Sequence, residues 1–174
     1  MTAPDLILIE TDRLWLTGWR EDQAGDLLRL HGDADTARYL SADGHAWTPE
    51  ECAAYVTTYI DNFRTHRWGK LRVIRKSDGA FVGRAGFGLL PPNGEPEIGY
   101  ALLPEHRGKG YAAEAASALR DWLFRETAWQ YFIGFADLRN GPSLKVLRDI
   151  GMVETHVGLL DGITGQFHIM RKPV

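Results

Sequence analysis

The feature that most constrains this chain is a glycine-rich turn between a predicted strand and a predicted helix. The strand is expected over residues 97–103, the turn contains Gly108 and Gly110, and the helix begins after Gly110. Glycine lets a backbone turn sharply and approach a ligand without a Cβ atom in the way. Successive backbone N–H groups in such a turn attract an anion together with the positive end of the helix. The segment therefore predicts a phosphate or pyrophosphate site, with a purely structural turn as the alternative.

Two common phosphate-binding motifs fit this turn poorly. A P-loop requires a lysine and a hydroxyl residue after its last glycine, whereas Tyr111 follows Gly110 here. Residues 108–113 do match a loose dinucleotide-binding pattern, G-x-G-x-x-A. The acidic residue that would bind the ribose, Asp137, lies further along the chain than the usual ~20 residues. Dinucleotide binding is therefore kept only as an alternative.

Length and charge indicate one domain that does not bind nucleic acid. The chain has 174 residues, of which 44% are hydrophobic, and its formal net charge is −3. We expect a single domain over residues 1–174, with no attraction to nucleic acid or anionic membranes. Cys52 is the sole cysteine, which excludes an intramolecular disulfide. No targeting or spanning segment is evident, so a cytoplasmic protein is expected.

Local patterns predict an order of helices, three strands, a helix, a strand, a helix and two strands. Residues 6–19 indicate a strand pair or one bent strand, followed by short helices at 21–30 and 33–40 and a helix that begins at Thr48. Strands are expected over 71–75, 80–90, 97–103, 131–137, 152–160 and 165–172, with helices after Gly110 and over 143–150. The basic stretch from Arg64 to Lys76, which includes Lys70 and Arg72, is interpreted as a solvated face. Adjacent strands mixed with single helices favour an α+β or mixed α/β domain.

The turn and its surroundings resemble a known enzyme family. Arg107, Gly110 and Ala112 occupy the defined places of the signature Q/R-x-x-G-x-G/A of the GNAT superfamily of N-acetyltransferases. Further matching elements follow in order: Thr11-Asp12-Arg13-Leu14, Gly83 and Gly86, Glu97-Ile98-Gly99-Tyr100, Asn140-Gly141-Pro142-Ser143, and Gly151. Together they are similar to the branch of ribosomal-protein N-terminal acetyltransferases called RimJ/RimL-like, over nearly the whole chain.

The resemblance implies a fold and a binding site for acetyl-CoA. The fold is a mixed, mainly antiparallel sheet of about seven strands with helices on both faces and a splay between the two central strands. The implied cofactor-binding residues are Leu102 and Leu103 for the pantetheine arm, Arg107, Gly108, Lys109, Gly110, Tyr111 and Ala112 for the pyrophosphate, and Asn140 and Ser143 near the thioester. No metal is expected, because the histidines show no metal-ligand spacing.

The resemblance also indicates candidate catalytic residues. Many GNAT enzymes protonate the departing thiolate with a tyrosine, but the corresponding residue here is Leu147, which cannot donate a proton. In the branch that this chain resembles, a serine takes that role, which implies Ser143. Asn140 and Ser143 also lie at a helix start, where helix capping is the alternative interpretation. Glu97 is the first candidate for the general base, before Glu95 and His106.

The resulting hypothesis is an N-acetyltransferase in which a primary amine attacks acetyl-CoA directly in a ternary complex. The acceptor is either a protein N-terminus or a small molecule, and the protein is a monomer or a homodimer. Because Leu147 replaces the tyrosine, a non-catalytic acyl-CoA sensor or partner module is the alternative.

Overall fold

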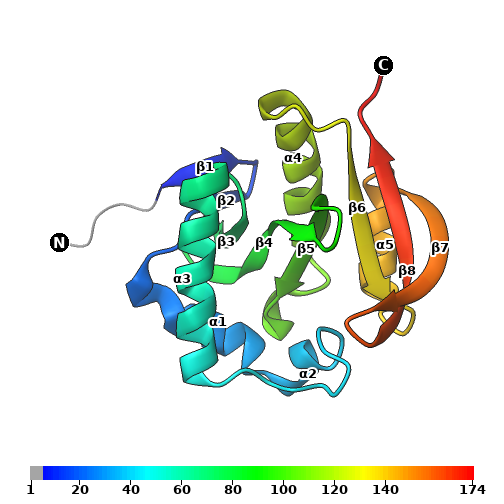
Figure 1. Ribbon diagram of the computed structural model, residues 1–174. Coiled ribbons are helices and arrows are strands. Elements are labelled where there is room, and N and C mark those ends of the chain that lie inside the picture. The colour runs from blue at the N-terminus through cyan, green and yellow to red at the C-terminus, as the bar shows by residue number, and fades with distance from the viewer. Residues whose placement is uncertain (1–5) are drawn as a thin grey trace.

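The computed structural model describes residues 6–174, which form one eight-stranded sheet flanked by helices (Figure 1). The strands are β1 (Ile7–Glu10), β2 (Leu14–Thr17), β3 (Lys70–Arg75), β4 (Phe81–Leu90), β5 (Glu95–Leu102), β6 (Tyr131–Asp137), β7 (Val153–Leu160) and β8 (Ile163–Arg171). Their spatial order is β1-β2-β3-β4-β5-β6-β8-β7. The predicted mixed, mainly antiparallel sheet is confirmed, with eight strands instead of about seven. Residues 6–19 form a strand pair, because the Thr11 N–H bonds to the Leu14 carbonyl at 2.9 Å and closes a turn.

The helices lie on both faces of the sheet, as predicted. They are α1 (Ala24–His31), α2 (Ala34–Ala37), α3 (Pro49–His66), α4 (Tyr111–Glu126) and α5 (Gly141–Asp149), with short 3-10 turns η1 (Glu21–Gln23) and η2 (Pro104–His106). Helices α1 and α3 cover the β3–β4 part of one face, and α4 and α5 lie against the other (Figure 1). Within residues 6–174, none of the helices has the length and apolarity that a bilayer crossing requires.

Two helix boundaries illustrate how local sequence sets these elements. The Thr48 hydroxyl accepts the Glu51 N–H, and the Glu51 carboxylate accepts the Thr48 N–H, so the predicted capping box begins α3. The helix predicted over 33–40 is wrong in length, since α2 ends after one turn. The Leu40 N–H bonds to the Ala37 carbonyl three residues earlier, which tightens the chain into a turn.

The two central strands diverge, as the resemblance implied. Strands β5 and β6 are parallel and pair only at Glu97 with Ile133 and at Ile98 with Gly134. Beyond these pairs, residues 99–102 of β5 and 135–137 of β6 do not pair with each other, while both strands remain bonded to their outer neighbours. The splay therefore opens the middle of a continuous sheet.

Packed cores on both faces hold the splay open. Phe87, Ile98 and Phe132 pack with α4 on one face, and Leu27, Val56 and Phe81 pack between α1, α3 and the sheet on the other. Dense apolar packing on both sides resists closure of the strands, because interiors do not deform continuously.

Candidate active site

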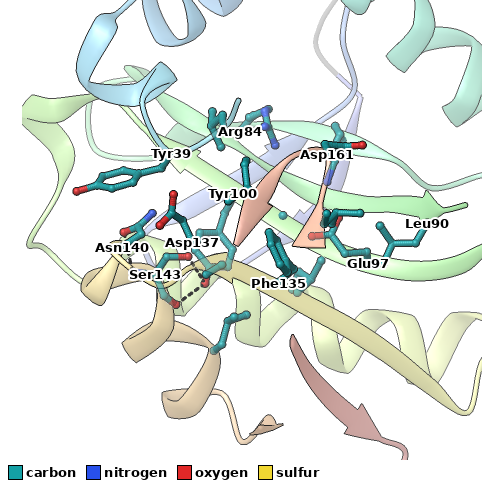
Figure 2. A pocket seen from close by; sticks show the side chains of 18 residues that line it. Tyr39, Arg84, Leu90, Glu97, Tyr100, Phe135, Asp137, Asn140, Ser143 and Asp161 are labelled. Atoms are coloured by element: carbon teal, nitrogen blue, oxygen red, sulfur yellow. Dashed lines mark hydrogen bonds between the residues drawn. The ribbon is translucent and has the colours of Figure 1, made fainter. Parts of the chain in front are cut away.

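A cavity of about 290 Å³ lies at the splay (Figure 2). Its walls come from both diverging strands, from α5, from the turn between β7 and β8, and from the segment after α2. The lining residues are Tyr39, Leu40, Lys70, Arg84, Leu90, Glu97, Ile98, Gly99, Tyr100, Phe135, Ala136, Asp137, Asn140, Ser143, Leu147, Leu160, Asp161 and Ile163. Positions 99 and 100 lie on opposite faces of β5, because the side-chain positions of neighbouring residues alternate along a strand. The cavity therefore passes from one face of the sheet to the other.

On the α5 side, a tyrosine and a serine are hydrogen-bonded to each other. The Ser143 Oγ–H donates to the Tyr100 hydroxyl at 3.2 Å, and the Tyr100 O–H donates to the Ser143 carbonyl at 2.9 Å (Figure 2). Burial raises the pKa of Tyr100, with the Ser143 hydrogen bond acting in the opposite direction, so the phenol stays protonated at neutral pH. The cavity therefore holds two hydroxyls beside the position of Leu147.

The expected capping role of Asn140 coexists with this arrangement. The Asn140 Oδ1 accepts the Ser143 N–H at 3.3 Å, and Pro142 follows at the start of α5. This bond uses the backbone of Ser143, so its hydroxyl remains directed to Tyr100. Asn140 thus fixes the first turn of the helix that presents Ser143 to the cavity.

On the α1–α3 side, two cations and a carboxylate share a surface floored by glycines. Residues Arg84, Gly86 and Gly88 of β4 alternate onto this face, and Gly99 and Glu97 lie opposite Gly86 and Gly88 on β5. A Cβ atom on Gly99 would lie 2.6 Å from Lys70 Nζ and 3.7 Å from Arg84 Nη1. Both cationic groups therefore approach the same point of the splayed strand.

The ionisation of Lys70 and Glu97 is set by their shared burial. Burial lowers the pKa of the Lys70 ammonium to about 8, an effect that Glu97 opposes and Arg84 reinforces. Burial also raises the pKa of Glu97, although Lys70 and Arg84 act against that shift. A carboxylate with a raised pKa binds a proton more readily, which suits the general base predicted at Glu97. The interpretation of the basic stretch as a solvated face is wrong for Lys70, and also for buried Arg72, which pairs with Asp26 at 2.6 Å.

Arg84 is held in place by a buried histidine. Its Nε–H donates to His31 Nε2 at 2.8 Å, and the His31 ring stacks on Trp47 with centroids 3.8 Å apart. The Tyr55 ring also stacks on Trp47, with centroids 3.9 Å apart. Burial, and then the charges of Arg84 and Lys70, lower the pKa of His31 to about 2. His31 is therefore a neutral acceptor for Arg84 in the folded protein.

The neutral state of His31 predicts a pH-dependent stability. Below pH 6.5 the unfolded chain protonates this histidine while the folded chain does not, so folding free energy is lost as the pH falls from about 6.5 toward 2. Between pH 7.5 and 5.5 the loss from this group is about 1.4 kcal/mol. The variant His31→Gln keeps an amide oxygen that can accept the Arg84 hydrogen bond but has no group that titrates. Its free energy of unfolding, measured in urea, should depend less on pH than that of the wild type. Equal pH dependence in the two proteins would show that His31 titrates in the folded state.

Among the residues that the structure describes, the glycine-rich turn leaves backbone N–H groups unpaired at the start of α4. Gly108 and Gly110 have φ angles of 72° and 81°, in the left-handed region. In the part of the chain that the structure describes, the backbone N–H groups of residues 108–113 have no hydrogen-bond acceptor, and they surround the N-terminus of α4. The Arg13 guanidinium braces the turn through the Lys109 carbonyl at 2.9 Å and Glu114 at 2.6 Å. Donors without partners at a helix start fit a phosphate group.

The other predicted site residues lie on β5 or in the segment that follows it. The Arg107 side chain bonds to the Leu102 carbonyl at 3.1 Å and to Thr36 at 2.9 Å, so it ties the turn to β5 and α2. Leu103 is buried among α1 and α3, and its N–H donates to the Val82 carbonyl. The two secondary base candidates, Glu95 and His106, are not among the residues that line the cavity: Glu95 accepts a bond from Tyr131, and His106 is buried in η2.

The structure adds three residues that the sequence did not single out for the site: Lys70, Arg84 and Tyr100. A cation inside a buried, glycine-rich strand was the available signal for Arg84, because such residues are rarely buried without a function or a partner. Asp137, considered for a ribose, instead pairs with Arg139 at 2.6 Å. Within residues 6–174 no cluster of metal-ligating side chains occurs.

Two parallel strands, β5 and β6, diverge within a mixed sheet, and the helix that follows β5 begins with backbone N–H groups that are unpaired within residues 6–174. Together these features define the fold of an acyl-CoA N-acyltransferase. The sequence profile described as "Acetyltransferase (GNAT) domain" matches residues 13–153. The N-acetyltransferase YnaD of Bacillus subtilis (strain 168) is 28% identical over 145 residues, which cover 83% of this chain and 81% of that protein.

Solved structures show the same fold. A GNAT-family acetyltransferase from Bacillus anthracis superposes with a TM-score of 0.81 at 22% identity, covering 94% of this chain and 97% of that one. RimL, the ribosomal L7/L12 α-N-protein acetyltransferase solved in complex with coenzyme A, gives a TM-score of 0.80 at 18% identity, covering 95% and 97%. The chain belongs to the GNAT acetyltransferase family, and it is an acetyl-CoA-dependent N-acetyltransferase.

Proposed function

We propose that this protein transfers the acetyl group of acetyl-CoA to a primary amine by direct attack in a ternary complex. The observation that carries the proposal is the cavity that passes through the sheet at the splay. Its α5 side holds hydroxyl donors, and its α1–α3 side holds Glu97 and two cations. Two substrates entering from opposite faces would meet at the splayed strands, so no covalent acyl-enzyme is required.

The free amides of the glycine-rich turn would hold the pyrophosphate of acetyl-CoA. The residues proposed for this are those from Arg107 to Ala112, with Arg107 fixing the turn to β5. Leu102 and Leu103 at the end of β5, together with Asn140 and Ser143, would lie along the pantetheine arm. Acetyl-CoA supplies an activated acyl group whose leaving group is a thiolate, with an unperturbed pKa near 8.5 for such thiols.

Two side chains of the cavity are proposed to move protons. Ser143 donates a proton to the departing sulfur, and Tyr100 holds the serine hydroxyl in place through their mutual hydrogen bond. Glu97 accepts a proton from the amine, which must be neutral to attack. The raised pKa of Glu97 brings its proton affinity closer to that of the amine than an exposed glutamate would have.

The proposed pyrophosphate site predicts a matched pair of glycine variants. Gly108 and Gly79 have φ angles of 72° and 71°, and a Cβ atom on either meets nothing within 4 Å. Changing either residue to alanine therefore carries the same backbone strain of about 1–2 kcal/mol. Isothermal titration with acetyl-CoA should show at least a tenfold weaker affinity for Gly108→Ala and wild-type affinity for Gly79→Ala. Equal affinities in both variants would place the pyrophosphate elsewhere.

Release of free CoA with a panel of primary amines tests the transfer itself. Amine-dependent release is expected, with the acetylated amine detected by mass spectrometry. Tight acetyl-CoA binding without release for any amine would instead support the acyl-CoA sensor.

A further inference from the structure

We propose that the acceptor is a small zwitterion, an amine with a carboxylate or phosphate group close to it, and that Arg84 and Lys70 bind that anion. This inference rests on the proposed acetyl transfer and specifies its acceptor. It assigns to the α1–α3 side of the cavity a binding site for the acceptor's negative group.

The strongest observation is a buried guanidinium with an unused donor. Arg84 is 8% exposed and lines the cavity, its Nε is bonded to His31, and its Nη1 has no partner within residues 6–174. A buried charged donor without a partner is costly unless a ligand or water satisfies it. The His31 bond fixes the plane of the guanidinium, so the site is rigid before the acceptor arrives.

Lys70 adds a second cation beside this donor. Within residues 6–174 its one hydrogen bond is a long one, 3.4 Å, to the Gly86 carbonyl. The Nζ atom lies over Gly99, the strand position that Arg84 Nη1 also approaches. Glycines at positions 88 and 99 leave the strand surface beside Lys70 Nζ without side chains, which gives an anion access to the cations. A carboxylate or phosphate has the several acceptor oxygens that two such donors require.

The cavity also carries negative groups, which is why a zwitterion fits better than a simple anion. Glu97 and Asp161 line it together with Arg84 and Lys70, whereas Asp137 is already paired with Arg139. The carboxylates favour an ammonium group on arrival, and the cations favour an anion. A peptide N-terminus has an uncharged amide next to its amine, so it leaves Arg84 unmatched.

The size of the cavity agrees with a small acceptor. Its volume of about 290 Å³ also has to admit the acetyl end of the donor. Pockets for drug-sized ligands span about 300–1,000 Å³. The remaining space suits a molecule of amino-acid size.

Matched pairs of amines test the proposal through CoA release. Each free amino acid is compared with its carboxamide, and O-phosphoethanolamine is compared with ethanolamine, at saturating acetyl-CoA. We expect kcat/KM to be roughly 10- to 100-fold higher for the anionic member of a pair. The amino-acid and phosphate arms then show which anion is preferred. Equal or higher values for the carboxamides and ethanolamine would overturn the proposal while leaving acetyl transfer intact.

Variants of the two cations assign the preference to this site. Arg84→Met and Lys70→Met should raise KM for the anionic amines by at least tenfold and leave acetyl-CoA affinity and the KM of carboxamides within twofold. Arg84→Met leaves His31 without its hydrogen-bond donor, which risks misfolding. Lys70→Met therefore tests the same site independently. Arg64→Met is the matched control, since Arg64 is exposed and pairs with Asp61 at 3.3 Å on α3. A preference that survives both cavity variants would contradict the assignment.

Calorimetry separates this inference from the proposed function. Titrating the best anionic amine into protein saturated with CoA measures acceptor binding without turnover. If the wild type binds the amine, Lys70→Met does not, and the wild type acetylates no amine, the anion site is supported and the transfer is refuted. Absence of binding together with absence of acetylation would refute both.

Discussion

Ser143→Ala is expected to lower kcat by about 100-fold while the dissociation constant for acetyl-CoA changes by less than twofold. General acid catalysis contributes about 10²–10⁴-fold when the donor is removed. Ser143 is the proposed donor because its hydroxyl lines the cavity and Leu147 has no proton to give. The substitution keeps the Ser143 N–H bond to Asn140, so the start of α5 is preserved. Steady-state kinetics of CoA release and acetyl-CoA titration measure the two quantities.

Two further variants make this prediction specific. Ser77→Ala, in the exposed turn between β3 and β4, serves as the control and should leave kcat unchanged. Tyr100→Phe removes the partner of the Ser143 hydroxyl and is expected to lower kcat by about tenfold, with KM unchanged, because Tyr100 acts by positioning the serine. A larger loss in Tyr100→Phe than in Ser143→Ala would move the proton donor to the tyrosine.

The parts of this protein that could be predicted from sequence are those set by neighbouring residues. The turn containing Gly108 and Gly110, the helix after it and the capping box at Thr48 each depend on a few adjacent residues. The predicted length of α2 was wrong because a 3-10 hydrogen bond at Leu40 replaces continuation of the helix. Side-chain periodicity carries little information about such a bond. Ser143 and Glu97 came from resemblance and spacing, and the structure places both in one cavity.

The missing part of the site depends on contacts between distant positions. Arg84 and His31 are 53 residues apart, and Tyr100 and Ser143 are 43 apart. Neither pair has a local pattern, since each forms only when a helix packs on the sheet. Lys70 was assigned to a solvated face because its strand is basic, although the alternation of β3 directs Lys70 into the cavity. Burial of that charge follows from the register of three strands, which composition does not determine.

Gly86 and Gly99, which are paired on β4 and β5, give a prediction in which two alanine substitutions have opposite consequences. At Gly86, a Cβ atom would lie 2.0 Å from the Gly69 carbonyl oxygen, which is backbone and belongs to the adjoining end of β3. At Gly99 the nearest atom is Lys70 Nζ, at 2.6 Å, the free end of a flexible side chain. Gly86→Ala must therefore separate β3 from β4, whereas Gly99→Ala only displaces Lys70.

We expect Gly86→Ala to lose about 3 kcal/mol or more of unfolding free energy, a large share of the 5–15 kcal/mol typical of a domain. Gly99→Ala should change it by less than about 1 kcal/mol, yet raise the acceptor KM at least tenfold, because the new methyl group moves Lys70 away from Arg84 and narrows the cavity. Urea unfolding and steady-state kinetics measure the two effects. Wild-type stability of Gly86→Ala would show that β3 can shift without cost, and then the strands beside the cavity would not be the rigid surface on which acceptor selection depends.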